Sequence, residues 1–193
     1  MSQQKTRDRI VEAADRLFYE KGYEYASFSD LAAALGIARG NVTFHFKTKD
    51  EILEAVIEYR LEKTRGMLER WEGEEGHGKE RIKSFIDILM ANRVKIMRYG
   101  CPVGTLCAEL AKLEHSALDH ANQIFTLFRE WLEGQFRSLG HSGNADSLAM
   151  HLLARSQGIA TLANAFQEET FLREEVRQLH DWLDSLSLPR RLR

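Results

Sequence analysis

Apolar residues recur at intervals of three and four along almost the whole chain, and this spacing constrains the fold more than any other feature. Such a period places apolar side chains on one face of a helix. Proline, which disrupts helix interiors, occurs only twice among the 193 residues, at Pro102 and Pro189. No segment has the pattern of a convincing strand. The sequence therefore predicts an all-α protein of about nine helices.

Capping and turn residues set the expected ends of the first helices. Apolar runs stop at Gly22 and at Gly36, and glycine is common directly after the last helical residue. Ser27 and Thr48 each begin a capping-box pattern, which is typical of a helix N-terminus. Residues 27–46 are therefore expected to form helix, tight turn and helix, the helix-turn-helix arrangement whose second helix can lie in the major groove of DNA.

Local charge supports a DNA-binding role for this segment. The whole chain carries 27 Lys and Arg against 29 Asp and Glu, a net charge of −2 that argues against a nucleic-acid binder when taken alone. Residues 36–49, however, contain three basic residues and no acid. The second short helix would present small or hydrogen-bonding residues, namely Arg39, Gly40, Asn41, Thr43 and His45. Arginine can bind guanine, and asparagine can bind adenine, through paired hydrogen bonds.

Residues 10–57 resemble the N-terminal domain of the TetR family of bacterial transcriptional regulators. The resemblance rests on three spaced motifs, A..LF...G in the first helix, S..DLA...G in the second, and HF..K..IL running into the fourth. It implies a homeodomain-like, three-helix DNA-binding domain over residues 1–50 and a TetR-type helical domain for ligand binding and dimerisation over residues 51–193. It also implies a homodimer that binds a palindromic operator in double-stranded DNA and releases it when a small-molecule effector binds.

The resemblance assigns a set of residues to the DNA-binding surface, which are Ser27, Arg39, Gly40, Asn41, Thr43, His45, Lys47 and Lys49. Ser27 would cap the second helix and contact phosphate, and Lys49 would contact the DNA backbone. Two positions depart from the usual family pattern. Ala38 stands where serine commonly caps the recognition helix, and the loss of such a cap costs about 1 kcal/mol. Thr43 stands where tyrosine is usual and has a shorter reach, while Phe46 is expected in the core.

The effector pocket that the resemblance implies would be enclosed by the middle helices. Candidates are Phe85, Leu89, Arg93, Met97, Cys101, Leu106, His120, Phe125, Phe128 and Trp131. An apolar stripe of this kind is more often simply core. Arg93, Asn92 and His120 are more specific candidates, because a polar group on a buried face needs a partner or a ligand.

The last two expected helices carry a face of small residues, which permits close approach of another helix. In the family, these two helices of each subunit form a four-helix dimer interface. Candidates for that interface, or for the core behind it, are Leu152, Ile159, Ala163, Phe166, Leu179, Leu183 and Leu186. The basic segment 189–193 that follows is expected to be exposed to solvent.

Cys101 offers an alternative to effector binding. Residues 100–109 resemble a GC..G.L..E segment found in one subgroup of the family, several of whose members are thought to respond to electrophiles. A thiol beside a helix N-terminus is more reactive, so thiol oxidation could be the input. A buried, inert thiol is the commoner case. A further alternative is a small-molecule-binding helical protein whose helix-turn-helix is vestigial.

Other classes of function are disfavoured by what the sequence lacks. It contains no P-loop, HExxH, CxxC or GxSxG pattern, and its seven histidines are scattered, so no enzyme, metal site or cofactor is expected. No apolar run is long enough to span a membrane, and the N-terminus lacks the apolar region of a signal peptide. We therefore expect a cytoplasmic, ligand-responsive repressor that acts as a homodimer and does not associate with membranes.

Overall fold

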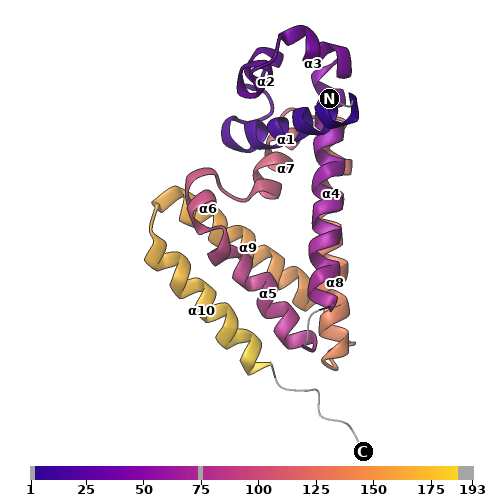
Figure 1. The fold of residues 1–193 in the computed structure, drawn as a ribbon. Helices are drawn as coiled ribbons and strands as arrows, with labels where there is room; N and C mark the ends of the chain where they lie inside the picture. Colours follow the sequence, from indigo (N-terminus) through magenta and orange to yellow (C-terminus); the bar gives the residue numbers. More distant parts are fainter. Residues whose placement is uncertain (1–2, 74–75, 187–193) are drawn as a thin grey trace, which may run out of the picture. The chain divides into compact units, whose positions relative to one another are not determined.

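The computed structural model describes residues 3–73 and 76–186, and these residues form ten α-helices and no strand (Figure 1). The helices are α1 (Gln3–Lys21), α2 (Phe28–Leu35), α3 (Arg39–His45), α4 (Lys49–Gly73), α5 (Gly78–Ala91), α6 (Arg93–Tyr99), α7 (Pro102–Lys112), α8 (Leu118–Ser138), α9 (Ala145–Phe166) and α10 (Glu169–Ser185). The all-α prediction is confirmed for this part of the chain. The segment 189–193, predicted to be exposed, lies outside the described residues.

One helix is expected from the apolar spacing between Ile82 and Met97, but the structure has two, α5 and α6. Asn92 separates them with φ −105° and ψ 13°, which are not α-helical values. Its side-chain Nδ2 donates to the carbonyl oxygen of Ile88 at 3.1 Å, and its backbone N–H donates to the same oxygen at 3.0 Å. Asparagine side chains compete in this way with the backbone hydrogen bonds of a helix. The break at Asn92 accounts for the tenth helix.

The chain forms two compact units. The head unit comprises residues 1–64 and 102–124, and the body unit comprises residues 65–101 and 125–193. Both α4 and α8 contribute one part to each unit. The predicted domain boundary at residue 50 falls inside the head unit, so a separate DNA-binding domain that ends there stays a prediction.

The head unit has a core of residues from α1, α3 and α4. Ile10 on α1, Val42 on α3 and Leu53 on α4 are each 0% exposed. Phe46, directly after α3, is 2% exposed, which confirms the prediction that it belongs to the core. The apolar side of α3 is thereby fixed against the head unit, and its other side faces outward.

A buried arginine connects three helices of the head unit. Arg60 on α4 is 8% exposed. Its Nε donates to the Asp15 carboxylate on α1 at 2.5 Å, and its Nη1 donates to the carbonyl oxygen of Pro102, the first residue of α7, at 2.6 Å. A buried guanidinium is stable only with such partners. This side chain therefore attaches α7 to α1 and α4 within the head unit.

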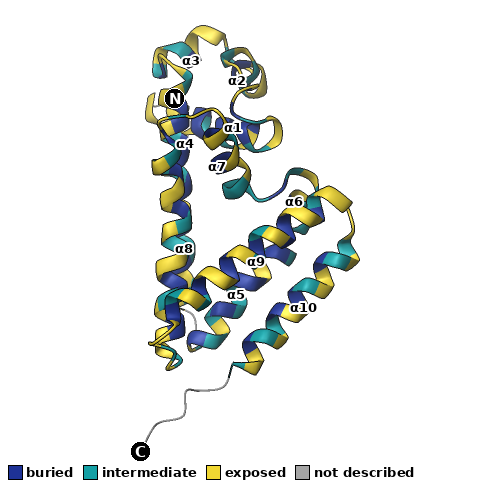
Figure 2. Cartoon of the chain, turned by 180° about the vertical axis from the view of Figure 1, so that it is seen from behind, coloured by how far each residue is buried: buried dark blue, intermediate teal, exposed yellow. Residues whose placement is uncertain are grey.

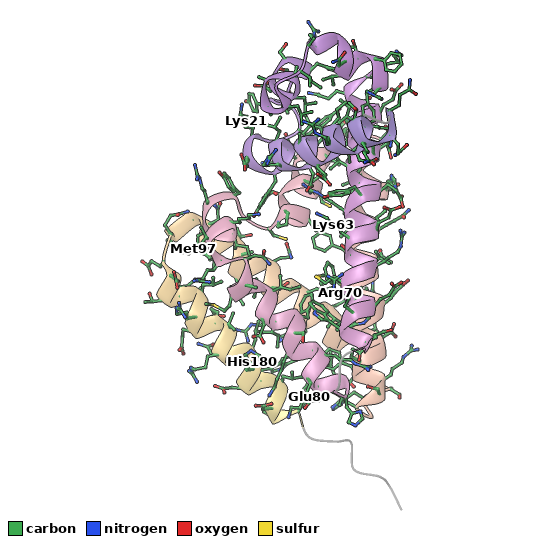
Figure 3. The ribbon with its side chains drawn as sticks, in the orientation of Figure 1. Lys21, Lys63, Arg70, Glu80, Met97 and His180 are labelled. Carbon is green, nitrogen blue, oxygen red and sulfur yellow. The ribbon has the colours of Figure 1, made fainter. Side chains whose placement is uncertain are left out.

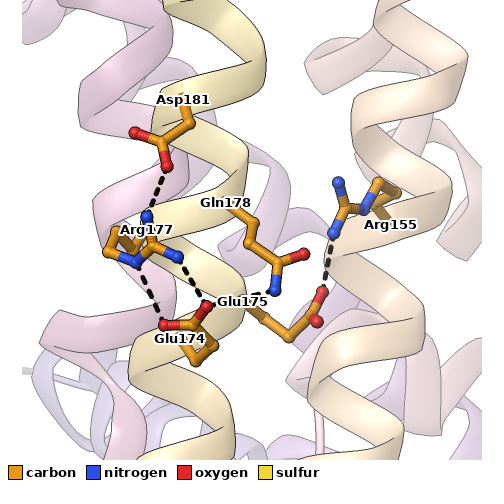
Figure 4. Close-up of polar contacts among 6 residues, drawn as sticks. All are labelled: Arg155, Glu174, Glu175, Arg177, Gln178 and Asp181. Atoms are coloured by element: carbon orange, nitrogen blue, oxygen red, sulfur yellow. Dashed lines mark hydrogen bonds and ion pairs between the residues drawn. The ribbon is translucent and has the colours of Figure 1, made fainter.

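The body unit has its own apolar core, formed by α5, α6, α9 and α10 with the adjoining parts of α4 and α8. Figure 2 shows buried residues along α5, α9 and α10. Polar pairs add to this packing at the surface. His180 on α10 lies 2.8 Å from Asp87 on α5 (Figure 3), and Arg155 on α9 donates to Glu175 on α10 at 2.7 Å (Figure 4).

Candidate DNA-binding surface

The turn between α2 and α3 follows from its local sequence. The Ser27 Oγ accepts a hydrogen bond from the backbone N–H of Asp30 at 3.2 Å, and the Asp30 carboxylate accepts one from the backbone N–H of Ser27 at 3.0 Å. The hydrogen bond with the Ser27 hydroxyl, above all, lowers the pKa of Asp30 below its ordinary value. Gly36 ends α2 with φ 64°, a left-handed conformation that glycine adopts without steric cost. The predicted capping box and turn are confirmed.

α3 buries one side and exposes the other. Its start at Ala38 has no side-chain cap, as the sequence predicts. At 3.6 residues per turn, Gly40 and Phe44 lie on the side opposite the buried Val42. The exposed or half-buried residues of α3 are Arg39, Gly40, Asn41, Thr43, Phe44 and His45. This set contains every residue of α3 that was predicted to contact DNA.

Gly40 stands on the exposed side of α3 without a structural need for glycine. It is not among the glycines with positive φ, and a Cβ added there would meet nothing within 4 Å. Inside a helix, glycine costs about 1 kcal/mol relative to alanine. The head unit therefore carries a destabilising residue at a place where its own packing gains nothing. The missing side chain leaves α3 open to close approach by another molecule.

Some of the polar side chains around Gly40 form hydrogen bonds within the protein and others do not. Arg39 and Asn41 are exposed, and no side-chain hydrogen bond or ion pair of either is found among the described residues. The Thr43 hydroxyl donates to the carbonyl oxygen of Gly40 at 3.1 Å. The Lys47 Nζ donates to the carbonyl oxygen of Thr43 at 2.9 Å, which satisfies the C-terminal end of α3. Arg39 and Asn41 are thus the groups most available to read bases.

Lys49, the first residue of α4, is held by the turn that follows α1. Its Nζ donates to the carbonyl oxygen of Glu24 at 2.8 Å and lies 4.5 Å from the centroid of the Tyr23 ring. An ammonium group has three donors. The contact with Glu24 therefore leaves two donors that can bind a phosphate.

Tyr23 is the centre of a polar cluster in the head unit. Its hydroxyl donates to Asp50 Oδ1 at 2.5 Å and lies 3.3 Å from His115 Nε2. Burial, together with the bond to Asp50, raises the pKa of the Tyr23 hydroxyl well above its ordinary value. The same bond lowers the pKa of Asp50. The backbone N–H of Ala117 donates to His115 Nδ1 at 3.1 Å, so a neutral imidazole with its proton on Nε2 fits both contacts.

Sequence reasoning leaves two residues out of this surface. Phe44 is 62% exposed on the outward side of α3, and its place four residues after Gly40 is the signal that could have assigned it there. Glu109 on α7 accepts hydrogen bonds from the backbone of Tyr23 and Glu24. Glu109 stands in the GC..G.L..E motif, but no local pattern links positions that lie 86 residues apart.

The predicted pocket residues are divided between the two units. Leu106 and His120 belong to the head unit, where His120 Nδ1 lies 2.5 Å from a carboxylate oxygen of Glu54. The other predicted pocket residues belong to the body unit. Among these, the rings of Phe85 and Phe128 are in contact, with centroids 5.4 Å apart. Leu89 is buried in the core, and Met97, Cys101, Phe125 and Phe128 pack against it while partly exposed.

Two polar side chains of the predicted pocket, Arg93 and Trp131, each have a buried N–H without a hydrogen-bond partner among the described residues. In Arg93 this group is Nε, which forms an ion pair with the Glu169 carboxylate at 3.3 Å, while Nη1 donates to the carbonyl oxygen of Met90. Trp131 is 8% exposed and lies against Trp71, with ring centroids 5.4 Å apart. Its Nε1 is buried and has no hydrogen-bond partner among the described residues. Such unsatisfied N–H groups are uncommon in folded proteins.

A surface hollow of about 510 Å³ lies between α1 and α4 within the head unit. Its lining includes the carboxylates of Asp8, Glu12 and Glu58 and the ring of Tyr59, and none of the predicted pocket residues. The Nζ of Lys63 lies 4.3 Å from the centroid of the Tyr59 ring.

Most of the predicted dimer residues lie in the core of the body unit. Leu152, Ile159, Ala163, Leu179 and Leu183 are at most 3% exposed, and Leu186 packs against the same core. Phe166 is 64% exposed. α9 carries large apolar residues on its outer side as well as on its core side, so sequence spacing does not distinguish the two. The exposed apolar and small residues of the outer side, which we call the α9 face, are Met150, Ala154, Gly158, Leu162, Ala165 and Phe166. Ser147, His151 and Thr161 are exposed on the same side of the helix.

Comparison with known proteins identifies the family. The sequence model for bacterial regulatory proteins of the tetR family matches residues 10–56. The crystal structure of a TetR transcriptional regulator from Legionella pneumophila is 30% identical to this chain, covers 92% of it and 96% of its own length, and has a TM-score of 0.81. The chain belongs to the TetR family of bacterial transcriptional regulators. It is therefore a DNA-binding transcriptional regulator of a non-enzymatic family, with the TetR fold and an N-terminal helix-turn-helix.

Curated relatives match part of the chain. An uncharacterized HTH-type regulator in the lacX 3' region of Lactococcus lactis subsp. lactis is 28% identical over 63% of this chain and 63% of its own length. The HTH-type transcriptional regulator TtgR of Pseudomonas putida is 38% identical over 28% of this chain, which corresponds to 26% of TtgR. The chain thus spans less than two thirds of the length of these curated relatives.

Two further observations concern other kinds of site. Of the helices in the described ranges, none is both long and apolar enough to cross a membrane. Within those same ranges, no group of three or more His, Cys, Asp or Glu side chains is arranged to hold a metal ion.

Proposed function

We propose that this TetR-family regulator is a cytoplasmic repressor that binds a palindromic operator in double-stranded DNA through α3 and Lys49. The observation that carries the proposal is the outward side of α3, where Gly40 has no role in the protein's own packing. Arg39 and Asn41, on the same short helix, are exposed and unpaired within the described residues. A glycine that admits the DNA backbone, with an arginine and an asparagine beside it, suits base recognition in the major groove.

The experiment is selection of bound sequences from a random DNA pool with the full-length protein. We expect a two-fold symmetric site whose half-sites lie one helical turn, or a multiple of it, apart. Replacement of Asn41 by alanine should change which bases are preferred within each half-site. Equal loss of affinity for every sequence would remove Asn41 from the set of residues that read bases.

We also propose that two copies pair through the α9 face. Alanine and glycine permit close approach of another helix, and Met150, Leu162 and Phe166 supply exposed apolar surface. Beside it, α10 presents charged residues that pair among themselves, as Arg177 does with Glu174 and Asp181 (Figure 4). An apolar centre with a charged rim is the usual composition of a protein–protein interface.

The proposed input is a small molecule that binds in the body unit. Support comes from the aromatic cluster of Trp71, Phe85, Phe128 and Trp131, and from the unsatisfied N–H of Trp131. An effector that binds the DNA-incompetent state more tightly than the competent one shifts the population away from DNA. Trp131→Phe keeps an aromatic side chain but removes the N–H donor together with the five-membered ring that carries it, so it should weaken release by an effector with a hydrogen-bond acceptor. Unchanged release would exclude Trp131 from the effector site.

A further inference from the structure

The carboxylate of Glu109 on α7 is hydrogen-bonded to the turn that follows α1. Glu109 Oε2 accepts a hydrogen bond from the backbone N–H of Tyr23 at 2.8 Å, and its Oε1 accepts one from the backbone N–H of Glu24 at 2.9 Å. Both contacts are charge-assisted, which makes them stronger than hydrogen bonds between neutral groups. One side chain of α7 therefore fixes two successive peptide groups of the turn.

Gly22 makes this approach possible. Its φ is 90°, a conformation that other residues rarely adopt, and a Cβ added there would lie 2.9 Å from Glu109 Oε1. The glycine predicted to end α1 thus has a second role. It leaves the space in which the Glu109 carboxylate reaches the two N–H groups.

The two residues whose N–H groups Glu109 binds are the ones that support Lys49. Glu24 donates its N–H to Glu109 and accepts a hydrogen bond from Lys49 Nζ at its carbonyl oxygen. Tyr23 donates its N–H to Glu109, and its ring lies under the Lys49 ammonium. Both supports of Lys49 are therefore fixed by the same carboxylate.

A second contact from beyond α7 acts on the same turn. His115 Nε2 lies 3.3 Å from the Tyr23 hydroxyl, which donates to Asp50, the residue directly after Lys49. The Tyr23 ring is thereby fixed from its hydroxyl end and from its backbone. All of these groups belong to the head unit.

We propose that Glu109 is a positioning residue for DNA binding, which holds the turn after α1 so that Lys49 is presented to a DNA phosphate. This inference rests on the proposed phosphate contact of Lys49. It assigns to the acid of the GC..G.L..E motif a function in the head unit, far along the chain from the recognition helix.

The direction in which DNA affinity changes distinguishes a positioning role of Glu109 from an effect of its charge alone. Glu109→Gln removes a negative charge, and by long-range electrostatics alone this change tightens binding to DNA. Positioning predicts the opposite, because an amide offers only one acceptor for the two N–H groups. Glu62→Gln is the matched control, since it makes the same charge change at an exposed position of α4 in the same unit.

The test is a double-mutant cycle on the full-length protein. Wild type, Glu109→Gln, Lys49→Ala and the double variant are titrated with a mixed-sequence duplex of about 30 base pairs at low salt, where binding depends on phosphate contacts. We expect Glu109→Gln to weaken binding roughly 3- to 10-fold in the presence of Lys49, and to have no weakening effect when Lys49 is alanine. Thermal unfolding of each variant is measured as well, so that a loss of stability can be distinguished from a loss of DNA affinity.

Other outcomes overturn the proposal in distinguishable ways. Equal weakening in both backgrounds means that Glu109 acts only through general stability. Binding that is unchanged, or tighter as in Glu62→Gln, means that the carboxylate acts only through its charge. If Lys49→Ala itself changes nothing, the phosphate contact fails together with this inference. If Glu109→Gln does not fold, Glu109→Asp, which keeps the charge but shortens the reach, takes its place in the cycle.

Discussion

α3 and α9 share a feature on their exposed sides, which is a glycine without packing contacts. Each carries a glycine, Gly40 or Gly158, at which an added Cβ would meet nothing within 4 Å. The surroundings differ, since α3 adds exposed polar groups such as Arg39 and Asn41, whereas the α9 face adds apolar side chains such as Leu162. In both proposals the glycine leaves room for close approach by another molecule. The difference lies in the residues around it, which are polar on α3, where we propose DNA binding, and apolar on the α9 face, where we propose a second copy of the chain.

The largest expected effect is on the α9 face. Gly158→Glu would place a charge in the proposed contact of two copies, and an unpaired buried charge costs about 3 to 5 kcal/mol. We expect the dimer dissociation constant to rise by at least about 100-fold, measured by analytical ultracentrifugation. Gly134 is the matched control, because it is an exposed helical glycine on α8 whose added Cβ also meets nothing within 4 Å. A Gly158→Glu protein that dimerises as well as Gly134→Glu would exclude this face.

Gly40→Ala tests the other half of the comparison. The added methyl group should stabilise the head unit by up to about 1 kcal/mol, because alanine favours the helix. It should weaken operator binding by roughly 10-fold, since a methyl group forced into a close contact typically costs 1 to 3 kcal/mol. Thermal unfolding and DNA titration measure the two effects separately. Tighter or unchanged DNA binding would mean that nothing approaches α3 closely at this point.

Lys49→Ala tests whether the head unit binds phosphate at the position described. We expect weaker binding to all DNA sequences and a salt slope lower by about one unit. The measurement is the affinity at several salt concentrations. Dimerisation should be unaffected, because Lys49 belongs to the head unit. A salt slope equal to that of the wild type would show that Lys49 releases no counterion.

Tyr23→Phe should give the smallest effect, with a defined dependence on pH. The bond from Tyr23 lowers the pKa of Asp50 below its ordinary value. A carboxyl with a lowered folded-state pKa contributes stability above its unfolded pKa and loses it as the pH falls through the folded value. The variant lacks this contribution, so it should be less stable than wild type at neutral pH. The difference in unfolding free energy between wild type and variant should shrink below about pH 4. Denaturant unfolding at several pH values measures this difference. A difference that is constant with pH would contradict the assigned hydrogen bond.

Local chemistry made much of the head predictable from sequence. Ser27 and Gly36 determine the ends of α2 by hydrogen bonds and backbone conformation within a few residues. The uncapped start of α3 at Ala38 and the burial of Phe46 follow from the same short-range patterns. The short helix α3 is therefore predictable from the sequence alone.

What was not predictable depends on distant residues or on two-sided helices. The contact of Glu109 with the turn after α1 joins positions 86 residues apart, and the pairing of His120 with Glu54 joins positions 66 residues apart. Neither leaves a periodic signal. On α9, Leu152 faces the core and Leu162 faces outward, although both are leucines of the same helix. Only packing against other helices separates the two.

The head unit is discontinuous in sequence, and this has a consequence for the order in which the protein can form during synthesis. The helix-turn-helix leaves the ribosome early, but α7 and the start of α8, residues 102–124, complete the same compact unit. Until Pro102 is made, the buried guanidinium of Arg60 lacks one of its acceptors, and until Glu109 is made the turn after α1 lacks its carboxylate. At about 5 to 20 residues per second, several seconds separate the emergence of α3 from that of the residues that hold Lys49 in place. A nascent chain that carries α3 therefore still lacks the contacts that complete the head unit.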